Sequence, residues 1–378
     1  MACLFLEFPA CQSESVRAEK GEKNLDKAFE GDTLVQTGDS TEETPEPPLP
    51  LSEEAAVPTV QSGERGAEPP EIFLPSSEEA PLPVSTFGEI WGYLISGKEQ
   101  AFTGELPLTD IGYFGAEVDS YGQLVNVPNP RDIPRFLGRI HLVVGCGSRA
   151  LSHFVLMEGS PVRKQLITDL LDQAKPFDGL QIDFELVPPR DRGNFHSFLA
   201  ELRKGLGNKR FTIALPARIR TLHNDVYDYE TIKPLVDRIL VMAYDEHWAT
   251  SEPGPIASLE WCKSVAAYSL NTIGSEKLIM GLPFYGRTWG SINLFRAFHF
   301  SGIQRIKQEQ KVTEVRRKQG IPTFTYEVPV TVTVYYEDDY SLSARMEMYR
   351  TLGVQAIGFW ALGQESPTVW KLLKLRNE

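Results

Sequence analysis

Two acidic side chains separated by one residue stand out in the segment 177–185, where polar and apolar residues alternate. If this segment is a β-strand, Gln181, Asp183 and Glu185 share one face, and the residues between them make the other face uniformly apolar. Burying two neighbouring carboxylates is costly unless they share a proton. A proton shared with Asp183 would keep Glu185 ready to act as a general acid near neutral pH. The alternative is a solvated strand end with two exposed acids, which the apolar opposite face disfavours.

The chain from about residue 86 alternates short apolar runs with helical patterns, which is typical of an α/β fold. Nearly continuous apolar runs, as expected for parallel strands buried on both faces, cover Gly88–Ile95, Asp110–Glu117, Arg139–Val144, Gly179–Glu185, Arg210–Leu215, Arg238–Tyr244, Lys277–Phe284 and Val354–Trp360. Helical patterns cover Pro161–Gln173, Arg190–Gly205, Tyr229–Val236, Leu259–Thr272 and Ser341–Leu352. This alternation predicts a (β/α)8 TIM barrel over residues 86–378. A doubly wound open sheet is the rival, but no GxGxxG motif follows the first strand.

A barrel would place the two acids at an open mouth. The apolar face of 177–185 must pack against helices, so Asp183 and Glu185 should line the barrel axis, with Glu185 at the C-terminal end where barrel enzymes do chemistry. The connection after the seventh strand is too long for a simple loop. We expect a small α+β insertion at about 290–340, forming one wall of the cleft, with a helix over Ile303–Lys318 and strands over Pro322–Glu327 and Val330–Tyr336.

Four motifs, each at a predicted strand end, resemble those of family 18 glycoside hydrolases, the chitinase and endo-N-acetylglucosaminidase group. They are Asp178-Gly179-x-x-x-Asp183-x-Glu185, Met242-Ala-Tyr-Asp245, Gly281-Leu-Pro-Phe-Tyr-Gly-Arg287 and Gly358-Phe-Trp-Ala-Leu-Gly363. The family usually has Asp at the position of Gln181, whereas its spore-cortex-lytic, peptidoglycan-directed branch often has Asn there. The segment Val187–Leu199 also resembles that branch. The resemblance identifies residues 86–378 as a catalytic barrel of this family.

The resemblance implies a retaining mechanism in which the 2-acetamido group of the sugar attacks its own anomeric carbon. Glu185 would donate the proton, Asp183 would orient the acetamide, and Tyr244 would hydrogen-bond its oxygen. The implied substrate-binding residues are Trp360, Tyr93, Asp178, Gln181, Asp245, Tyr285, Arg287 and Met242. For Trp360 the alternative is a core residue, for Asp178 a turn residue, and for Met242 packing. A cis peptide bond between Trp360 and Ala361, frequent in the family, is also expected.

The first 83 residues account for the whole net charge of −13, because they hold 18 acids and 5 bases while the rest of the chain is balanced. Neutral charge in the folded part gives no support for nucleic-acid binding. The segment 12–83 is acidic, holds 10 of the 27 prolines and has few aromatic residues. This composition predicts a disordered linker or tether.

The start of the chain, residues 1–11, is short and largely apolar. Phe8-Pro9-Ala10-Cys11 resembles the end of a bacterial lipoprotein signal, which would predict lipidation of Cys11, a membrane tether and a location in the bacterial cell envelope. An apolar start without function is the alternative. No apolar run reaches 18 residues, so we expect no transmembrane helix.

No cofactor or metal is predicted, because the six histidines are scattered singly and no cysteine pair has zinc-ligand spacing. Cys146 and Cys262 are expected to be buried thiols. The favoured function is hydrolysis of β-1,4 bonds at N-acetylglucosamine in peptidoglycan by a monomer, with chitin as the alternative substrate. A carbohydrate-binding protein without activity is the first alternative function, and an adhesive surface protein that acts through its acidic tail is the second.

Overall fold

The computed structural model describes residues 81–102, 104–133, 136–290, 296–328 and 330–376, which all belong to one compact unit. The sequence-based predictions for residues 1–11, for lipidation of Cys11 and for nearly all of the 12–83 linker therefore lie outside the described residues. Within the described ranges, no helix combines the length and the apolar character that crossing a bilayer requires.

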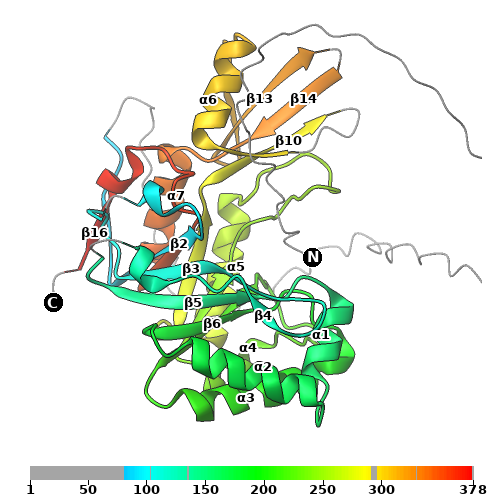
Figure 1. The fold of residues 1–378 in the computed structure, drawn as a ribbon. Coiled ribbons are helices and arrows are strands. Elements are labelled where there is room, and N and C mark those ends of the chain that lie inside the picture. Colours follow the sequence, from blue (N-terminus) through cyan, green and yellow to red (C-terminus); the bar gives the residue numbers. More distant parts are fainter. Residues whose placement is uncertain (1–80, 103, 134–135, 291–295, 329, 377–378) are drawn as a thin grey trace, which may run out of the picture. The chain divides into compact units, whose positions relative to one another are not determined.

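Eight parallel strands form a closed barrel, which confirms the predicted (β/α)8 TIM barrel (Figure 1). Going around the barrel, they are β2 Glu89–Ile95, β3 Asp110–Val118, β5 Arg139–Gly145, β6 Gly179–Asp183, β7 Arg210–Pro216, β8 Arg238–Met242, β9 Leu278–Pro283 and β15 Ala356–Trp360. The barrel closes because β15 pairs with both β9 and β2. All eight predicted strands are present.

Helices follow most of the strands. They are α1 Arg149–Leu156, α2 Pro161–Gln173, α3 Arg192–Leu206, α4 Tyr229–Ile232, α5 Leu259–Thr272 and α7 Asp339–Thr351. All of them except α3 begin at a side-chain cap. Single turns of 3-10 helix are η1 Glu99–Ala101, η2 Pro130–Asp132, η3 Pro189–Asp191, η4 Lys233–Leu235 and η5 Val369–Leu372. The predicted helix over Tyr229–Val236 is split into α4 and η4 at Pro234, whose ring cannot continue an α-helix. Short strands complete the unit: β1 Ser85–Phe87 pairs with β16 Leu373–Leu375, and β4 Leu124–Val125 with β3.

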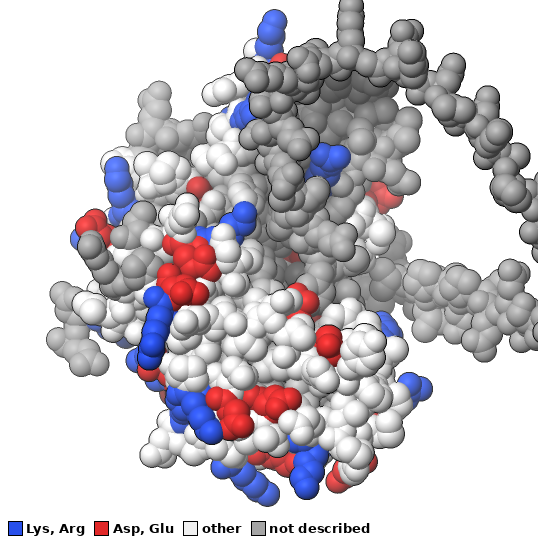
Figure 2. Space-filling view, in the orientation of Figure 1, with Lys and Arg blue, Asp and Glu red and all other residues white. Residues whose placement is uncertain are grey.

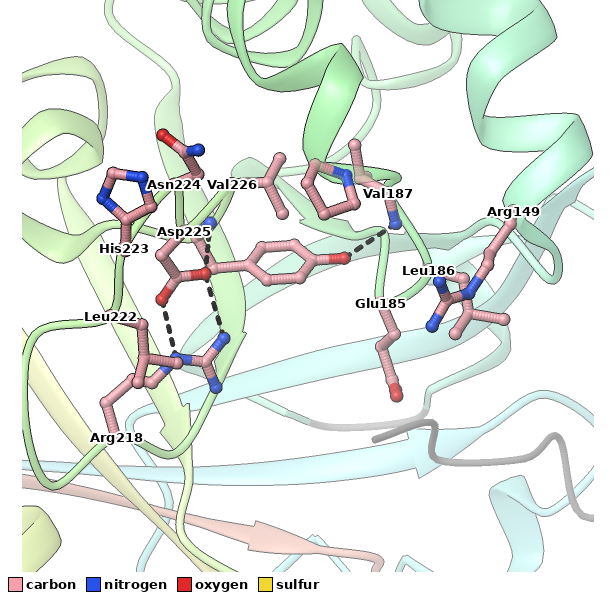
Figure 3. Close-up of a pocket in the computed structure, with 12 residues that line it drawn as sticks. Arg149, Glu185, Leu186, Val187, Arg218, Leu222, His223, Asn224, Asp225 and Val226 are labelled. Atoms are coloured by element: carbon pink, nitrogen blue, oxygen red, sulfur yellow. Dashed lines mark hydrogen bonds and ion pairs between the residues drawn. The ribbon is translucent and has the colours of Figure 1, made fainter. Parts of the chain in front are cut away.

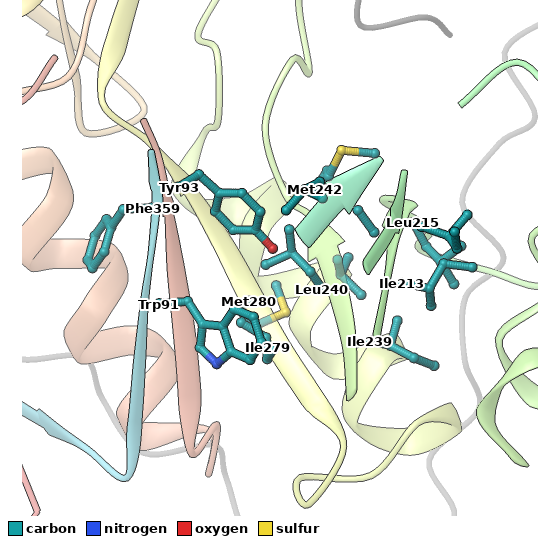
Figure 4. Packing of buried hydrophobic residues seen from close by; sticks show 14 of the residues in the cluster. Trp91, Tyr93, Ile213, Leu215, Ile239, Leu240, Met242, Ile279, Met280 and Phe359 are labelled. Carbon is teal, nitrogen blue, oxygen red and sulfur yellow. The ribbon is translucent and has the colours of Figure 1, made fainter. Parts of the chain in front are cut away.

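The two faces of β6 divide as its sequence predicts. Phe184, directly after the strand, stacks on Phe195 and Phe198 of α3, with ring centroids 6.4 and 5.8 Å apart. Gln181, from the other face, is fully buried inside the barrel. Figure 4 shows the same division on the other side of the barrel, where Trp91 and Tyr93 lie on one side of the strands and Phe359 on the other.

The insertion after β9 is an antiparallel sheet with one helix. Its elements are β10 Tyr285–Gly290, β11 Arg296–His299, α6 Phe300–Glu309, β12 Arg316–Lys318, β13 Ile321–Val328 and β14 Val330–Tyr335. The sheet starts before the predicted boundary at about 290, because β10 follows β9 almost directly. The predicted helix over Ile303–Lys318 was wrong in its second half: α6 ends at Glu309, Lys311 has a left-handed φ of 51°, and the chain returns as β12.

Candidate active site

The carboxyl end of β6 carries both acids, but only one lies on the strand. The strand ends at Asp183, and Glu185 lies in the turn that follows, not on a strand extending to 185 as the sequence predicted. Tyr227 holds this turn: its hydroxyl donates to the carbonyl of Phe184 at 2.7 Å and accepts from the Val187 N–H at 2.9 Å. These two bonds satisfy backbone groups that a continued strand pairing would otherwise satisfy.

Asp183 is half-buried, and its Oδ1 atom is fully buried without a hydrogen-bonding partner among the described residues. Burial disfavours the ionised form, and it raises the pKa of Asp183 to about 7. The hydroxyl of Tyr227 is close enough to both acids that Glu185 and Asp183 add to the effect of burial in raising the pKa of Tyr227. The two acids therefore lie in one electrostatic environment at the barrel mouth.

A polar layer lies beneath Asp183 inside the barrel. The Tyr93 hydroxyl donates to Gln181 Oε1 at 2.7 Å, and Gln181 Nε2 donates to Thr212 Oγ1 at 3.0 Å. The prediction of Gln181 as a sugar contact needs correction, because its side chain is 0% exposed and its amide is bonded on both sides within the barrel. Gln181 instead belongs to the polar layer that lies beneath Asp183. Tyr93 is also buried, at 3% exposure.

Trp360 ends β15 at the same mouth, and it is partly exposed. Its ring lies between Tyr93, with centroids 5.8 Å apart, and Phe114, which meets it edge-on at 5.1 Å. The peptide bond between Trp360 and Ala361 is cis, as the sequence analysis expected. An indole fixed by two aromatic neighbours, with part of its surface open, is a suitable platform for stacking a sugar ring.

Residues of two further motifs meet where β8 ends and β10 begins. Asp245 Oδ1 accepts hydrogen bonds from the Tyr285 hydroxyl at 2.6 Å and from Arg287 Nε and Nη2 at 2.9 and 2.6 Å. Tyr244 packs edge-on against the Tyr285 ring, with centroids 6.3 Å apart. A Cβ at Gly281 would come within 3.0 Å of the Tyr244 ring, so glycine is needed there. The insertion is thus bonded to the residues that follow β8.

Two of the predicted substrate contacts, Asp178 and Met242, are poorly placed to meet a ligand. Asp178 precedes β6 and so lies at the opposite end of the barrel from the mouth, where its carboxylate accepts from the Ile140 N–H at 2.8 Å. The prediction that it contacts substrate was therefore wrong, because a parallel strand puts its first and last residues at opposite ends of the barrel. Met242 is the last residue of β8 and is 9% exposed, which leaves little of it available to a ligand.

A pocket of about 280 Å³ lies directly beside Glu185 (Figure 3). Glu185 forms one side, together with Arg149 at the start of α1, and the loop after β7 forms the other. On that loop Arg218 and Asp225 make a two-point ion pair with distances of 2.7 and 3.0 Å. Sequence reasoning missed Tyr227, Arg149 and this pair, because none of them belongs to a motif. The one local signal was the position of the loop after β7, at a strand's carboxyl end.

On the face drawn in Figure 2, acidic and basic side chains are interspersed. No group of three His, Cys, Asp or Glu side chains in the described ranges could hold a metal ion. Cys146 and Cys262 are buried free thiols, as expected from the sequence.

The arrangement gathers the parts that acid-catalysed glycoside cleavage needs. Glu185 is partly exposed at the rim, Asp183 is a desolvated carboxyl two residues before it, and Trp360 offers an aromatic platform. A desolvated carboxylate without a partner is well placed to stabilise positive charge that develops on a bound ligand.

A family model for glycosyl hydrolases family 18 matches residues 139–365. The uncharacterized glycosylase YvbX of Bacillus subtilis (strain 168) is 30% identical over 233 residues, which are 58% of this chain and 67% of YvbX. A protein of Bacillus anthracis named cortical fragment-lytic enzyme is 25% identical over 241 residues, 58% of this chain and 54% of that protein. The chain thus spans between about half and two thirds of the length of these relatives.

The same fold occurs in the Bacillus cereus spore cortex-lytic enzyme SleL. Its crystal structure superposes with a TM-score of 0.68 and 21% identity, over 77% of this chain and 76% of SleL. A likeness at this identity speaks for the fold alone. The family model covers more than half of the chain, including Asp183 at the end of β6, Glu185 in the turn after it and every strand of the barrel from β5 onwards. The chain therefore belongs to glycosyl hydrolases family 18.

Proposed function

We propose that the chain is a retaining glycosidase that cleaves β-1,4 bonds at N-acetylglucosamine in peptidoglycan. The observation that carries this proposal is the buried, unpartnered Oδ1 of Asp183 two residues before the accessible Glu185 at the barrel mouth. Membership in a glycoside hydrolase family supports the reaction class. Peptidoglycan is favoured because a similar protein of Bacillus anthracis is named cortical fragment-lytic enzyme.

In the proposed first step, the acetamide oxygen of the sugar bonds to its own anomeric carbon as the glycosidic bond breaks. Glu185 transfers its proton to the leaving oxygen, which departs as an alcohol. The sugar is left as a cyclic oxazolinium ion whose positive charge lies partly on the acetamide nitrogen. Asp183 accepts a hydrogen bond from that N–H, and the hydroxyl of Tyr244 holds the acetamide oxygen.

In the second step, water attacks the anomeric carbon from the side that the leaving group vacated. Glu185, now ionised, takes a proton from this water and is restored, while the ring of the oxazolinium opens to the acetamide. Two inversions at one carbon give net retention, and no nucleophile from the protein is needed. The positive intermediate supplies the partner that Asp183 lacks in the free protein.

The test compares the chain with its Glu185→Gln variant on purified peptidoglycan and on chitin oligosaccharides. We expect the unmodified chain to release fragments with N-acetylglucosamine at the new reducing end, identified by borohydride reduction and mass spectrometry. Proton NMR during early turnover should show the β-anomer first. Release of the α-anomer first, or equal turnover by the Glu185→Gln variant, would rule out the proposed mechanism.

Chitin is the second candidate substrate, and a chitinase from Chromobacterium violaceum shares the fold with a TM-score of 0.67. The same experiment ranks the two polymers by kcat/KM. Binding of either polymer without release of fragments would instead favour the carbohydrate-binding alternative. An envelope location through lipidated Cys11 is a separate proposal, which fractionation of cells that carry Cys11→Ala tests.

A further inference from the structure

The pocket beside Glu185 contains a cation that no described residue neutralises. Arg149 is exposed at the first turn of α1, and its guanidinium has no hydrogen bond or ion pair within the described residues. Resting on the proposed function, we propose that this pocket binds the carboxylate on the muramic acid that leaves when the bond is cut, with Arg149 as its cationic partner.

The position of the pocket supports this assignment. Glu185 must come within hydrogen-bonding distance of the leaving oxygen, so the sugar that carries this oxygen has to lie against Glu185. The pocket has Glu185 in its wall and Arg149 on the same side (Figure 3). A substituent on the leaving sugar therefore reaches Arg149 without crossing the platform formed by Trp360, which lies on the far side of the barrel from β6.

Arg149 differs from Arg218, the other arginine of the pocket, in whether its charge is compensated. Arg218 gives both its Nε and its Nη2 to the carboxylate of Asp225, so these two charges cancel. Arg149 makes no such pair, and in the step that needs a protonated Glu185 no negative charge on Glu185 offsets the positive charge of Arg149. An anion in this pocket would meet one uncompensated cation, with which it can form a charge-assisted hydrogen bond.

Chitin offers nothing to that cation because its sugars are neutral. Muramic acid carries a lactyl ether on its third oxygen, which has a methyl group and ends in a carboxylate or in a short peptide with its own carboxylate. The pocket pairs Arg149 with apolar walls from Leu186, Val187 and Leu222. Its volume of about 280 Å³ is slightly below the range of about 300–1,000 Å³ typical of pockets for whole small molecules, as a substituent would require.

Binding measured in catalytically disabled protein tests the pocket independently of turnover. The Glu185→Gln chain is titrated calorimetrically with three tetrasaccharides: chitotetraose, the alternating N-acetylglucosamine–muramic acid tetramer, and that tetramer with its lactyl carboxylates reduced to alcohols. Adding Arg149→Gln should weaken binding of the acidic tetramer about tenfold and leave the other two unchanged within twofold. A fourth ligand, with alanine on each lactyl group, distinguishes the lactyl carboxylate from a peptide carboxylate.

The matched control is Arg376→Gln in the same background. Arg376 is exposed after β16 and loses the same charge at a site outside the pocket, and its side chain has no partner within the described residues. Equal weakening of all ligands by Arg149→Gln, or equal weakening of the acidic tetramer by both substitutions, would overturn the assignment. Charge-selective binding by the Glu185→Gln chain, together with no turnover by the unmodified chain, would support the pocket and refute the proposed function. Turnover by the unmodified chain without charge-selective binding would support the proposed function and refute the pocket.

Discussion

The two ends of the barrel differ in whether the protein supplies hydrogen-bonding partners to a desolvated acid. At the amino ends of the strands, Asp110 is fully buried and accepts two hydrogen bonds of 2.7 Å from Arg139 and one of 2.8 Å from His141. At the carboxyl ends, Asp183 has a buried oxygen without a partner among the described residues. The first arrangement fits a structural role, because its charges are compensated within the protein. The second leaves a charge for a ligand to compensate.

The pKa values follow the same division. Burial alone would raise the pKa of Asp110, but the hydrogen bonds from His141 and Arg139 outweigh it and lower this pKa to about 2. Burial of Asp183 meets no such opposition, and its pKa rises to about 7. The amino end of the barrel therefore gains stability from its acid being ionised, whereas the carboxyl end loses stability when its acid ionises.

The largest effect should come from Asp183→Asn, measured on activity. We expect kcat to fall about 100- to 1,000-fold, because a neutral amide cannot stabilise the positive charge of the intermediate as a carboxylate does. Steady-state hydrolysis of a chromogenic N-acetylglucosamine glycoside measures it, with circular dichroism to show that the fold is retained. A fall of less than threefold would mean that the unpartnered acid is not used in catalysis.

Asp110→Asn should lower the stability of the fold and leave activity nearly unchanged. It removes the anionic partner of the fully buried His141 and leaves Arg139 only its longer ion pair with Glu89 at 3.9 Å, so we expect the free energy of unfolding to drop by about 3 kcal/mol at pH 7. Urea denaturation measures this loss. The value of kcat per folded molecule should stay within twofold of the unmodified chain. A large loss of kcat without loss of stability would remove the contrast between the two ends.

The pH dependence of stability should show the two acids acting in opposite directions. Asp183 has a folded pKa above its ordinary value of 3.8, so its contribution is present below pH 4 and is lost as the pH rises through about 7. Asp110 has a folded pKa below 3.8, so its contribution is present above pH 4 and is lost as the pH falls through about 2. The contribution should be on the order of 4 kcal/mol for Asp183 and on the order of 2 kcal/mol for Asp110.

Urea denaturation from pH 3 to pH 8 separates the two contributions. Asp183→Asn should become more stable relative to the unmodified chain as the pH rises from 4 to 8, and the disadvantage of Asp110→Asn should begin to shrink as the pH falls from 4 to 3. Parallel stability curves for both variants and the unmodified chain would contradict the pKa values on which the comparison stands.

The fold was largely predictable because its signals are local and repeated. Each barrel strand is a short apolar run, and the alternation around Asp183 was enough to assign its two faces. The prediction failed where an element depends on distant residues. Glu185 lies in a turn because the hydroxyl of Tyr227, far along the chain, bonds to the backbone on both sides of it. Periodicity cannot reveal such a contact.

The candidate site was predictable in part for the same reason. Motif residues at strand ends meet at the mouth, whereas Asp178 belongs to a motif but lies at the wrong end of its strand. Gln181 was placed correctly on the inner face, but its burial depends on Tyr93 and Thr212 from neighbouring strands. Arg149 and Arg218 come from loops, where sequence alone gives no direction for a side chain.

Tyr227→Phe should give the smallest effect. It tests whether the position of Glu185 at the barrel mouth depends on the hydrogen bonds from the Tyr227 hydroxyl. Loss of the hydroxyl leaves the Phe184 carbonyl and the Val187 N–H without their partner, so we expect about 1 kcal/mol less stability. The turn that carries Glu185 should loosen, lowering kcat about tenfold with KM within twofold, because the proposed sugar platform at Trp360 is untouched. Urea denaturation measures the loss of stability, and steady-state kinetics measure kcat and KM.

Tyr229→Phe is the matched control, since its hydroxyl donates to the carbonyl of Pro216 at 2.7 Å and does not contact the turn. Equal loss of kcat in both variants would show that general destabilisation, rather than the position of Glu185, limits turnover.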